Sequence, residues 1–317
     1  MIATRPLLVL VGPTAIGKTD FSLRIAEEFS AEIVSVDSMQ VYRNMDIGTA
    51  KPTREEQTRI PHHLIDIVDP DEEYTVGRFV EDARQTIDTI TGNGKIPLLV
   101  GGTGMYFKGL FEGLFEPGDT PLEKKTTVRE MLRHKLLEEG GRAALWRDLK
   151  CHDPLSADRI HPNDTQRLMR ALEIFHLTGI PWSEHLRQQK EGTKTEERFI
   201  LKLGLTCDRD ELYRRINLRV QLMIDQGLLD EVRSLLQMGY HSGLKSMQSI
   251  GYRHMINYLD GVFTWPQAIE LLARDTRRYA KRQYTWFRQD AGIQWYGTVQ
   301  QKELRGCIQG FLKNNPS

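Results

Sequence analysis

The chain has 317 residues, enough to bury a sizeable core, and the usual domain size of about 100–200 residues predicts one large domain or two. Its 43 basic and 43 acidic residues cancel and 39% of its residues are hydrophobic, as in an ordinary globular protein, so net charge identifies no partner. Three widely separated cysteines indicate neither a disulfide framework nor a zinc site, and no apolar run approaches the roughly 18–20 residues that span a bilayer, so we expect a cytoplasmic protein without a membrane partner.

Short apolar runs that end in glycine or polar residues predict strands at Leu7–Val11, Ile33–Val36, Leu64–Val68, Pro97–Val100 and Phe199–Leu205. Between the first four lie segments with a helical period, such as Thr19–Phe29 and Val76–Thr89. Continuous apolar strands that alternate with amphipathic helices are typical of a parallel sheet that is covered on both faces. The sequence therefore predicts an α/β core.

The composition changes after Gly113–Pro121, where charged sequence with a helical period begins and continues to about Gln189–Arg198. Glycines that end helices help to predict helices over Leu122–Gly141, Gly141–Lys150 and Asp164–Gly179. We interpret residues 118–197 as a helical insertion domain in a core made of residues 1–117 and 198–317. The C-terminal region of this core is predicted to be helical at Asp208–Gln226, Leu228–Met238 and Trp265–Arg288.

A phosphate-binding loop follows the first strand, where GPTAIGKT matches the pattern GxxxxGK[ST] between an apolar strand and a helix. The loop comprises Gly12, Pro13, Thr14, Ala15, Ile16, Gly17, Lys18 and Thr19. Its glycines let successive N–H groups point at an anion, and the next helix adds about half a positive charge. We expect Lys18 to reach a terminal phosphate and the Thr19 hydroxyl to ligate Mg²⁺. The α/β fold is thus predicted to be P-loop NTPase-like.

This loop does not identify what the phosphate is attached to. A P-loop ATPase has an apolar strand ending in an aspartate that positions Mg²⁺ and water. The candidates in HLIDIVDP, Asp66 and Asp69, are ambiguous, and the other plausible strand, IPLLVGGTGMY, ends in glycines without an acid. The sequence therefore gives little support for nucleotide hydrolysis.

Two further polar segments follow strands, and ligands of open α/β sheets bind at the carboxyl ends of the strands. Asp37 follows the second strand and is a candidate base for a nucleophile that attacks the phosphate-bearing substrate. The alternatives are that Asp37 caps the next helix or binds Mg²⁺ through water. In the run Gly101–Gly104, the Thr103 hydroxyl can donate and accept a hydrogen bond, although such a run also occurs as a purely structural turn.

Seven segments in order between residues 12 and 288 resemble the tRNA dimethylallyltransferases, also called tRNA isopentenyltransferases: GPTAIGKT, VDSMQVYRNMDIGTAKP, PHHLIDIVDP, LLVGGTGMY, HPNDTQRLMRALEI, SMQSIGYRH and RRYAKRQYTWFR. The resemblance implies transfer of a dimethylallyl group from dimethylallyl diphosphate to N6 of the adenosine 3′-adjacent to the anticodon, in tRNAs that read codons beginning with U. It also implies that the P-loop holds the diphosphate of the donor, so that no nucleoside triphosphate need be consumed. The bacterial form is the better comparison, because no paired Cys or His of a zinc finger follows the core.

By the same resemblance, the catalytic residues are Lys18, Asp37, Thr103 and Arg219. Lys18, the loop N–H groups, Arg219 and Mg²⁺ held through Thr19 would stabilise charge on the leaving diphosphate. The spacing of Arg219 from Arg215 puts both on one helix face, where a solvated arginine is the alternative. Asp37 becomes the preferred general base, Thr103 orients the amine, and the adenine is flipped out of the stacked loop to reach them.

The resemblance further implies contacts with the tRNA anticodon stem-loop, partly through the insertion domain. The residues concerned are Asp37, Ser38, Met39, Gln40, Thr103, Lys125, His161, Pro162, Asn163, Asp164, Thr165, Ser249, Ile250, Gly251, Tyr252 and Arg253. Asn163 or Asp164 is also expected to cap a helix. No obligate protein partner is evident.

A basic stripe on the helix Trp265–Arg288 is another candidate RNA surface. It comprises Arg274, Arg277, Arg278, Lys281 and Arg282, with only Asp275 close by. Tyr279, Tyr284, Trp286 and Phe287 are interleaved with these cations and are candidates for stacking on unpaired bases. The alternatives are a solvated charged face and aromatic side chains that belong to the core.

Two other functions fit the motifs when they are read without the resemblance. One is a P-loop kinase for a small nucleoside or sugar, with Asp37 as the base and the insertion as a lid. The other is a non-catalytic RNA-binding module gated by a nucleotide.

Overall fold

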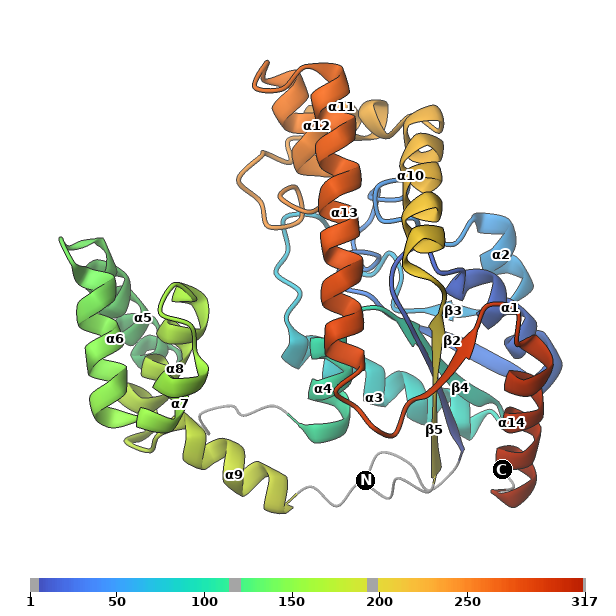
Figure 1. The fold of residues 1–317 in the computed structure, drawn as a ribbon, viewed down its shortest axis with the longest axis horizontal. Helices are drawn as coiled ribbons and strands as arrows, with labels where there is room; N and C mark the ends of the chain where they lie inside the picture. Colours follow the sequence, from blue (N-terminus) through green and yellow to red (C-terminus); the bar gives the residue numbers. More distant parts are fainter. Residues whose placement is uncertain (1–5, 114–120, 193–198, 316–317) are drawn as a thin grey trace. The chain divides into compact units, whose positions relative to one another are not determined.

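The computed structural model describes residues 6–113, 121–192 and 199–315, and the chain forms two compact units (Figure 1). The first unit contains Met1–Phe111 and Thr195–Ser317, and the second contains Glu112–Lys194. The domain boundaries predicted at residues 117/118 and 197/198 lie outside the described residues. No helix within the described ranges is long and apolar enough to cross a membrane.

A six-stranded parallel sheet forms the centre of the first unit and confirms the predicted α/β class. The strands are β1 (Leu7–Val11), β2 (Ala31–Val36), β3 (His62–His63), β4 (Ile96–Gly101), β5 (Ile200–Thr206) and β6 (Gln294–Gly297). Their order across the sheet is β3-β2-β4-β1-β5-β6, with every neighbouring pair parallel. The strands β1 and β4 at the centre are almost completely buried, because helices cover both faces.

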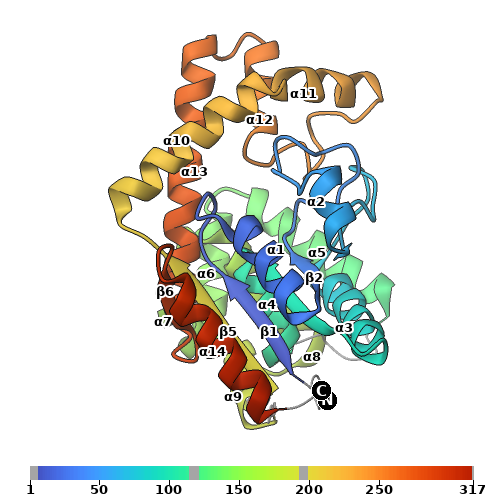
Figure 2. The same cartoon turned by 90° about the vertical axis from the view of Figure 1, so that its right-hand side faces the viewer.

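The helices of the first unit are α1 (Lys18–Phe29), α2 (Arg54–Arg59), α3 (Val76–Gly92), α4 (Gly104–Glu112), α10 (Arg209–Asp225), α11 (Leu228–Gln237), α12 (Tyr252–Leu259), α13 (Trp265–Phe287) and α14 (Gln301–Asn314). The chain moves across the sheet in one direction from β1 to β2 and in the other from β3 to β4. Right-handed crossovers therefore place α1 and α3 on opposite faces. Helix α14 lies beside α1 on one face of the sheet (Figure 2).

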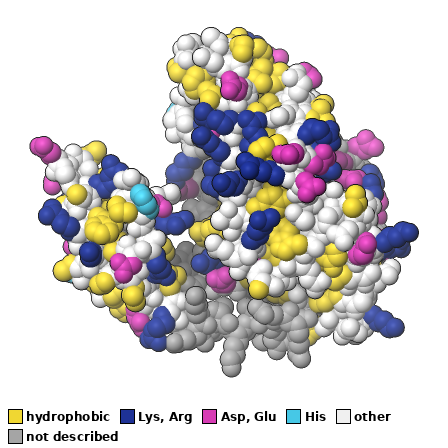
Figure 3. Space-filling model, in the orientation of Figure 1, with side chains coloured by type: hydrophobic (Ala, Val, Ile, Leu, Met, Phe, Trp, Pro, Cys, Tyr) yellow, Lys and Arg dark blue, Asp and Glu magenta, His cyan; other side chains and the backbone are white. Residues whose placement is uncertain are grey.

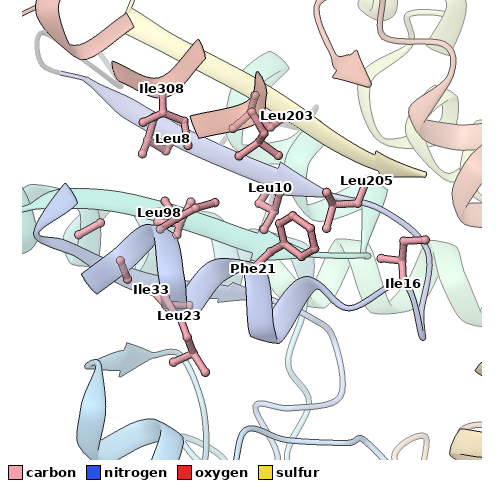
Figure 4. Close-up of a cluster of buried hydrophobic side chains, with 14 of the residues drawn as sticks. Leu8, Leu10, Ile16, Phe21, Leu23, Ile33, Leu98, Leu203, Leu205 and Ile308 are labelled. Carbon is pink, nitrogen blue, oxygen red and sulfur yellow. The ribbon is translucent and has the colours of Figure 1, made fainter. Parts of the chain in front are cut away.

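The buried core between α1, α14 and the sheet is mostly aliphatic, and Phe21 contributes an aromatic ring (Figure 4). Leu8, Leu98 and Leu203 come from three neighbouring strands, and they pack against Phe21 of α1 and Ile308 of α14. This core fixes β1 and α1, and hence the turn between them. Helices α10 to α13 stand beyond the carboxyl ends of the strands (Figures 1 and 2).

The third strand differs from its predicted position. We predicted Leu64–Val68, whereas β3 occupies His62–His63. Leu64 and Asp66 have positive φ values of 61° and 56°, which end the extended backbone. Val68 forms an isolated bridge with Tyr42 instead.

The second unit is helical and has its own core. Its helices are α5 (Leu122–Leu137), α6 (Gly141–His152), α7 (Pro154–Arg159), α8 (Thr165–Thr178) and α9 (Trp182–Gly192). Leu132, Leu145 and Leu168 bring α5, α6 and α8 together in one buried cluster. Gly179 ends α8 in a left-handed conformation with φ 74°, which is the helix-ending role predicted for it.

Candidate active site

The phosphate-binding loop forms the turn between β1 and α1. Ala15 and Gly17 have positive φ values of 64° and 101°, and Gly17 is the N-cap of α1. Left-handed residues in such a turn direct successive N–H groups toward the interior of the loop. The Ile16 side chain is fully buried in the core, so its backbone is the part that faces a ligand.

Lys18 is the cation of this loop. Its Nζ donates hydrogen bonds to the carbonyl oxygens of Gly12 at 2.9 Å and Pro13 at 2.8 Å. Burial, together with the neighbouring Arg219 and against the effect of Asp37, lowers the pKa of Lys18 from 10.5 to about 7. A bound anion favours the charged form of lysine, so it would raise this pKa again. The site is therefore electrostatically suited to an anion.

Two arginines of α10 face the loop. Arg215 donates through Nη1 to the carbonyl oxygen of Ile16 at 3.1 Å and through Nε to Glu211 at 2.6 Å. Arg219, one turn further along, is half-buried, and its partial desolvation lowers the pKa of its guanidinium group while Asp37 raises it. Arg215 thus attaches α10 to the phosphate loop, whereas Arg219 adds charge to the site.

Asp37 lies at the end of β2 and caps a turn. Its Oδ1 accepts hydrogen bonds from the backbone N–H groups of Met39 at 2.8 Å and Gln40 at 3.3 Å. Thr103 supports the same turn, because its Oγ1 accepts from the backbone N–H of Ser38 at 3.2 Å. The side chain of Asp37 therefore caps a turn and not a helix, as the capping alternative had it, because no helix follows at this position.

Two cavities adjoin at the carboxyl ends of the strands. The smaller cavity, about 120 Å³, is lined by Lys18, Thr19, Ser35 and Gln40 among others, and by Thr14, Ala15 and Gly17 of the loop. The larger cavity, about 290 Å³, has an apolar wall that includes Ile216, Val220, Met223, Ile250 and Leu272. Five residues line both cavities: Thr14, Asp37, Thr49, Arg219 and Tyr279. Lys18, Asp37 and Arg219 thus meet at one place, as predicted, whereas Thr103 lines neither cavity.

The loop Asp46–Thr49 forms part of the cavity walls and is held by a residue that the sequence did not reveal. Glu231 of α11 accepts hydrogen bonds from the backbone N–H groups of Asp46, Ile47 and Gly48 at 2.9, 2.7 and 3.1 Å. It also accepts from the Tyr252 hydroxyl at 2.6 Å. A single carboxylate therefore joins the loop, α11 and the start of α12.

Several residues of the first unit that are predicted to contact tRNA lie near the cavities. Ser38, Met39, Ser249, Ile250 and Arg253 line the larger cavity. Tyr252 is fully buried with its hydroxyl on Glu231, and Gly251 makes the left-handed turn before α12, so both support the fold at this point.

The remaining predicted tRNA contacts belong to the second unit. Lys125 lies half-exposed on α5, and His161, Pro162 and Asn163 are exposed before α8. Of the two predicted caps, Asp164 is the one observed, because its side chain accepts from the Arg167 N–H at 3.1 Å. Thr165 begins the helix that Asp164 caps.

The basic stripe of α13 lies on the surface, where lysine and arginine side chains gather over this helix (Figure 3). Asp275 organises part of it, accepting Arg253 at 2.6 Å and Arg274 at 3.1 Å, with Arg278 at 3.7 Å. The proposed base-stacking role is wrong for Phe287, which is buried in the core. Tyr284 also packs on the core, and its hydroxyl lies 3.2 Å from the Thr206 hydroxyl.

The two candidate acids for nucleotide hydrolysis do not reach the site. Asp66 pairs with Lys51 at 2.5 Å and Asp69 with Arg43 at 3.0 Å. Neither aspartate lines either cavity. This geometry gives no support to ATPase chemistry of the usual P-loop kind.

Comparison with known proteins finds similarity along the whole chain. A family model described as IPP transferase matches residues 40–290, and one described as isopentenyl transferase matches residues 6–66. A tRNA dimethylallyltransferase of Desulfotalea psychrophila is 53% identical over 315 residues, which cover 99% of this chain and 98% of that protein.

Solved structures give the same result. The full-length tRNA isopentenylpyrophosphate transferase from Bacillus halodurans is 40% identical, with a TM-score of 0.71 and 98% of each chain covered. A eukaryotic dimethylallyltransferase acting on tRNA is 28% identical, with a TM-score of 0.85 over 99% of this chain and 81% of that one. These similarities favour a transferase over a small-molecule kinase.

Proposed function

The chain belongs to the tRNA dimethylallyltransferase family, and we propose that it transfers a dimethylallyl group from dimethylallyl diphosphate to N6 of the adenosine 3′-adjacent to the anticodon. The tRNAs concerned are those that read codons beginning with U, and the reaction belongs in the cytoplasm. The observation that carries the proposal is the meeting of Lys18, Asp37 and Arg219 where the two cavities adjoin. In the proposed reaction, these residues would form an anion site beside a carboxylate base.

The smaller cavity suits the diphosphate of the donor. Lys18, Arg219 and the N–H groups of residues 15–19 provide positive charge and donors in a partly buried place, where such charges act more strongly than in water. The same groups would stabilise the negative charge that develops as the allylic C–O bond breaks. Diphosphate then leaves without any nucleoside triphosphate being consumed.

Magnesium fits this cavity on chemical grounds. Thr19 offers a hydroxyl and Asp37 a carboxylate at its wall, and oxygen ligands with substrate phosphates are what Mg²⁺ prefers. The described residues contain no group of three or more His, Cys, Asp or Glu that could hold a metal, so most ligands would come from the substrate and water. Bound through Thr19, Mg²⁺ would supply charge neutralisation at the diphosphate.

The larger cavity suits the adenosine, since its wall includes Ser249, Ile250 and Arg253 together with Asp37. Oδ1 of Asp37 already accepts two backbone hydrogen bonds, so we assign the proton of N6 to Oδ2. The N6–C bond forms as the C–O bond breaks, and the proton passes from N6 to Asp37. Thr103 orients this step by supporting the Asp37 turn through Ser38.

The anticodon stem-loop would be bound by residues of both units, including Lys125 and the exposed segment His161–Thr165. The basic stripe of α13 would contact the phosphates of the stem-loop.

The test is to incubate the purified protein with radiolabelled dimethylallyl diphosphate, unmodified tRNA and Mg²⁺ without ATP. Label should enter tRNA that carries adenosine next to the anticodon, and not a control tRNA in which that base is guanosine. Absence of transfer, together with ATP-dependent phosphorylation of a small molecule, would overturn the proposal.

A further inference from the structure

The side chain of Gln283 connects two turns that belong to opposite ends of the proposed reaction. Gln283 lies on α13 and is only 5% exposed. Its Oε1 accepts the backbone N–H of Thr14 at 2.8 Å, and its Nε2 donates to the carbonyl oxygen of Gly102 at 3.0 Å. The first contact reaches the phosphate loop after β1, and the second reaches the turn after β4.

The chemistry of these two contacts suits the primary amide of glutamine. A backbone N–H can only donate and a backbone carbonyl can only accept, so the connecting group must accept on one side and donate on the other. Glutamate would keep the acceptor for Thr14 but would lose the donor for Gly102. Methionine, which has a similar length, would lose both hydrogen bonds.

The close packing of α13 against the second turn depends on glycines. A Cβ at Gly102 would lie 2.0 Å from the Gln283 Nε2, and one at Gly104 would lie 2.1 Å from Cδ1 of Trp286. Tyr279, one helical turn before Gln283, lies half-buried beside Thr103 and Gln283. The glycine-rich run is therefore the surface on which α13 rests.

The second turn leads directly to Asp37. The Thr103 N–H donates to the carbonyl oxygen of Val36 at 3.3 Å, and Thr103 Oγ1 accepts from Ser38. Asp37 lies between Val36 and Ser38 in the chain. A fixed Gly102–Thr103 turn therefore also fixes Asp37.

On the basis of the proposed function, we propose that Gln283 is a positioning residue that sets the placement of the phosphate loop relative to the Asp37 turn. In the proposed reaction, the phosphate loop holds the leaving group and the Asp37 turn holds the base. Gln283 does not act on either substrate. Its two hydrogen bonds align the departing diphosphate with the attacking amine, and misalignment by about 1 Å is enough to slow such a reaction by about 100-fold.

The test compares Gln283→Met and Gln283→Glu with Gln289→Met and Gln289→Glu. Gln289 is a matched control, because it is exposed just after the end of the same helix. Each variant is saturated with tRNA and donor, and the rate of a single turnover is measured on the preformed complex. Separate titrations give the dissociation constants of tRNA and of dimethylallyl diphosphate.

We expect both Gln283 variants to turn over the bound substrates roughly 30–100-fold more slowly than the wild type, with both dissociation constants within about fivefold, because alignment is lost and binding groups remain. Both Gln289 variants should match the wild type. A merely structural role would lower the fraction of protein that binds tRNA and leave the rate of the bound complex unchanged, which would overturn the inference.

The inference would also be overturned if a Gln283 variant lost affinity for dimethylallyl diphosphate by the same factor as it lost rate, because Gln283 would then be a binding residue. The Glu variant, which keeps the Thr14 contact and the size of the side chain, maintains the test if the Met variant folds poorly. If the wild type itself transfers no label to tRNA, the proposed function fails, whereas equal rates in wild type and variants reject only the role of Gln283.

Discussion

Replacing Glu231 with alanine should destabilise the first unit, because this one carboxylate accepts four hydrogen bonds from two separate segments. Its Oε2 accepts from the N–H groups of Asp46 and Ile47, and its Oε1 accepts from the Gly48 N–H and the Tyr252 hydroxyl. Alanine leaves all four donors without this acceptor. The cost then depends on which of them water can reach.

The Asp46 hydrogen bond is exposed, so water can replace the carboxylate there at little cost. The bonds of Ile47 and Gly48 are partly buried, and Tyr252 is fully buried. An unsatisfied buried donor costs about 1–3 kcal/mol. Allowing for water at the two backbone groups, we expect the free energy of unfolding to fall by about 3 kcal/mol, out of a total of about 5–15 kcal/mol.

Urea denaturation measures this loss, and Asp230→Ala is the matched control. Asp230 precedes Glu231 in the first turn of α11, so both substitutions remove the same favourable charge at the helix N-terminus. The Asp230 side chain is 77% exposed and forms a surface ion pair with Arg233, so its removal should cost no more than about 0.5 kcal/mol. Equal losses for the two variants would refute this account of Glu231.

Three further predictions concern the cavities. Asp37→Asn should reduce the rate of single-turnover prenyl transfer by about 10²–10⁴-fold and leave tRNA affinity unchanged. The amide oxygen of asparagine still caps the turn, but it is a poor base. A variant that loses tRNA binding and keeps a normal rate would show that Asp37 is a recognition residue. Diphosphate binding near pH 8 should take up protons in the wild type and not in Lys18→Met. The Lys18 pKa of about 7 leaves this amine largely neutral until a bound anion raises that pKa. Calorimetry in buffers of different ionisation enthalpy measures the proton uptake, and equal uptake in both proteins would contradict the prediction. Gly102→Ala should cost about 1–3 kcal/mol in urea denaturation, because its Cβ would displace the Gln283 amide from its two hydrogen bonds. A wild-type unfolding curve would show that the Gln283 side chain adjusts freely.

The parts of the fold that the sequence predicted are those in which burial is continuous. The strands β1, β2, β4 and β5 appear as apolar runs, because helices cover the sheet on both sides. The edge strands β3 and β6 have only two and four residues and are half-buried, so they leave no such run. Apolarity at Leu64 and Val68 instead predicted a strand where positive φ values turn the chain.

The candidate site divides in the same way. Lys18 and Thr19 could be predicted because the phosphate loop is a local structure whose residues are adjacent in the chain. Glu231 and Gln283 could not, because the backbone groups that Glu231 holds are 183 to 185 positions away and those that Gln283 holds are 181 and 269 positions away. A buried polar side chain on a helix has no periodic pattern that distinguishes it from a solvated one.

Helix α13 shows why sequence patterns revealed one of its faces and not the other. Arg274, Arg278 and Arg282 recur every four residues and are visible as a basic stripe. Tyr279 and Gln283 have the same spacing, but their environment depends on the distant Gly102–Thr103 turn. Because one rigid helix carries both faces, a change on the outer face should alter tRNA affinity and its dependence on salt, whereas a change on the inner face should alter the rate of the bound complex.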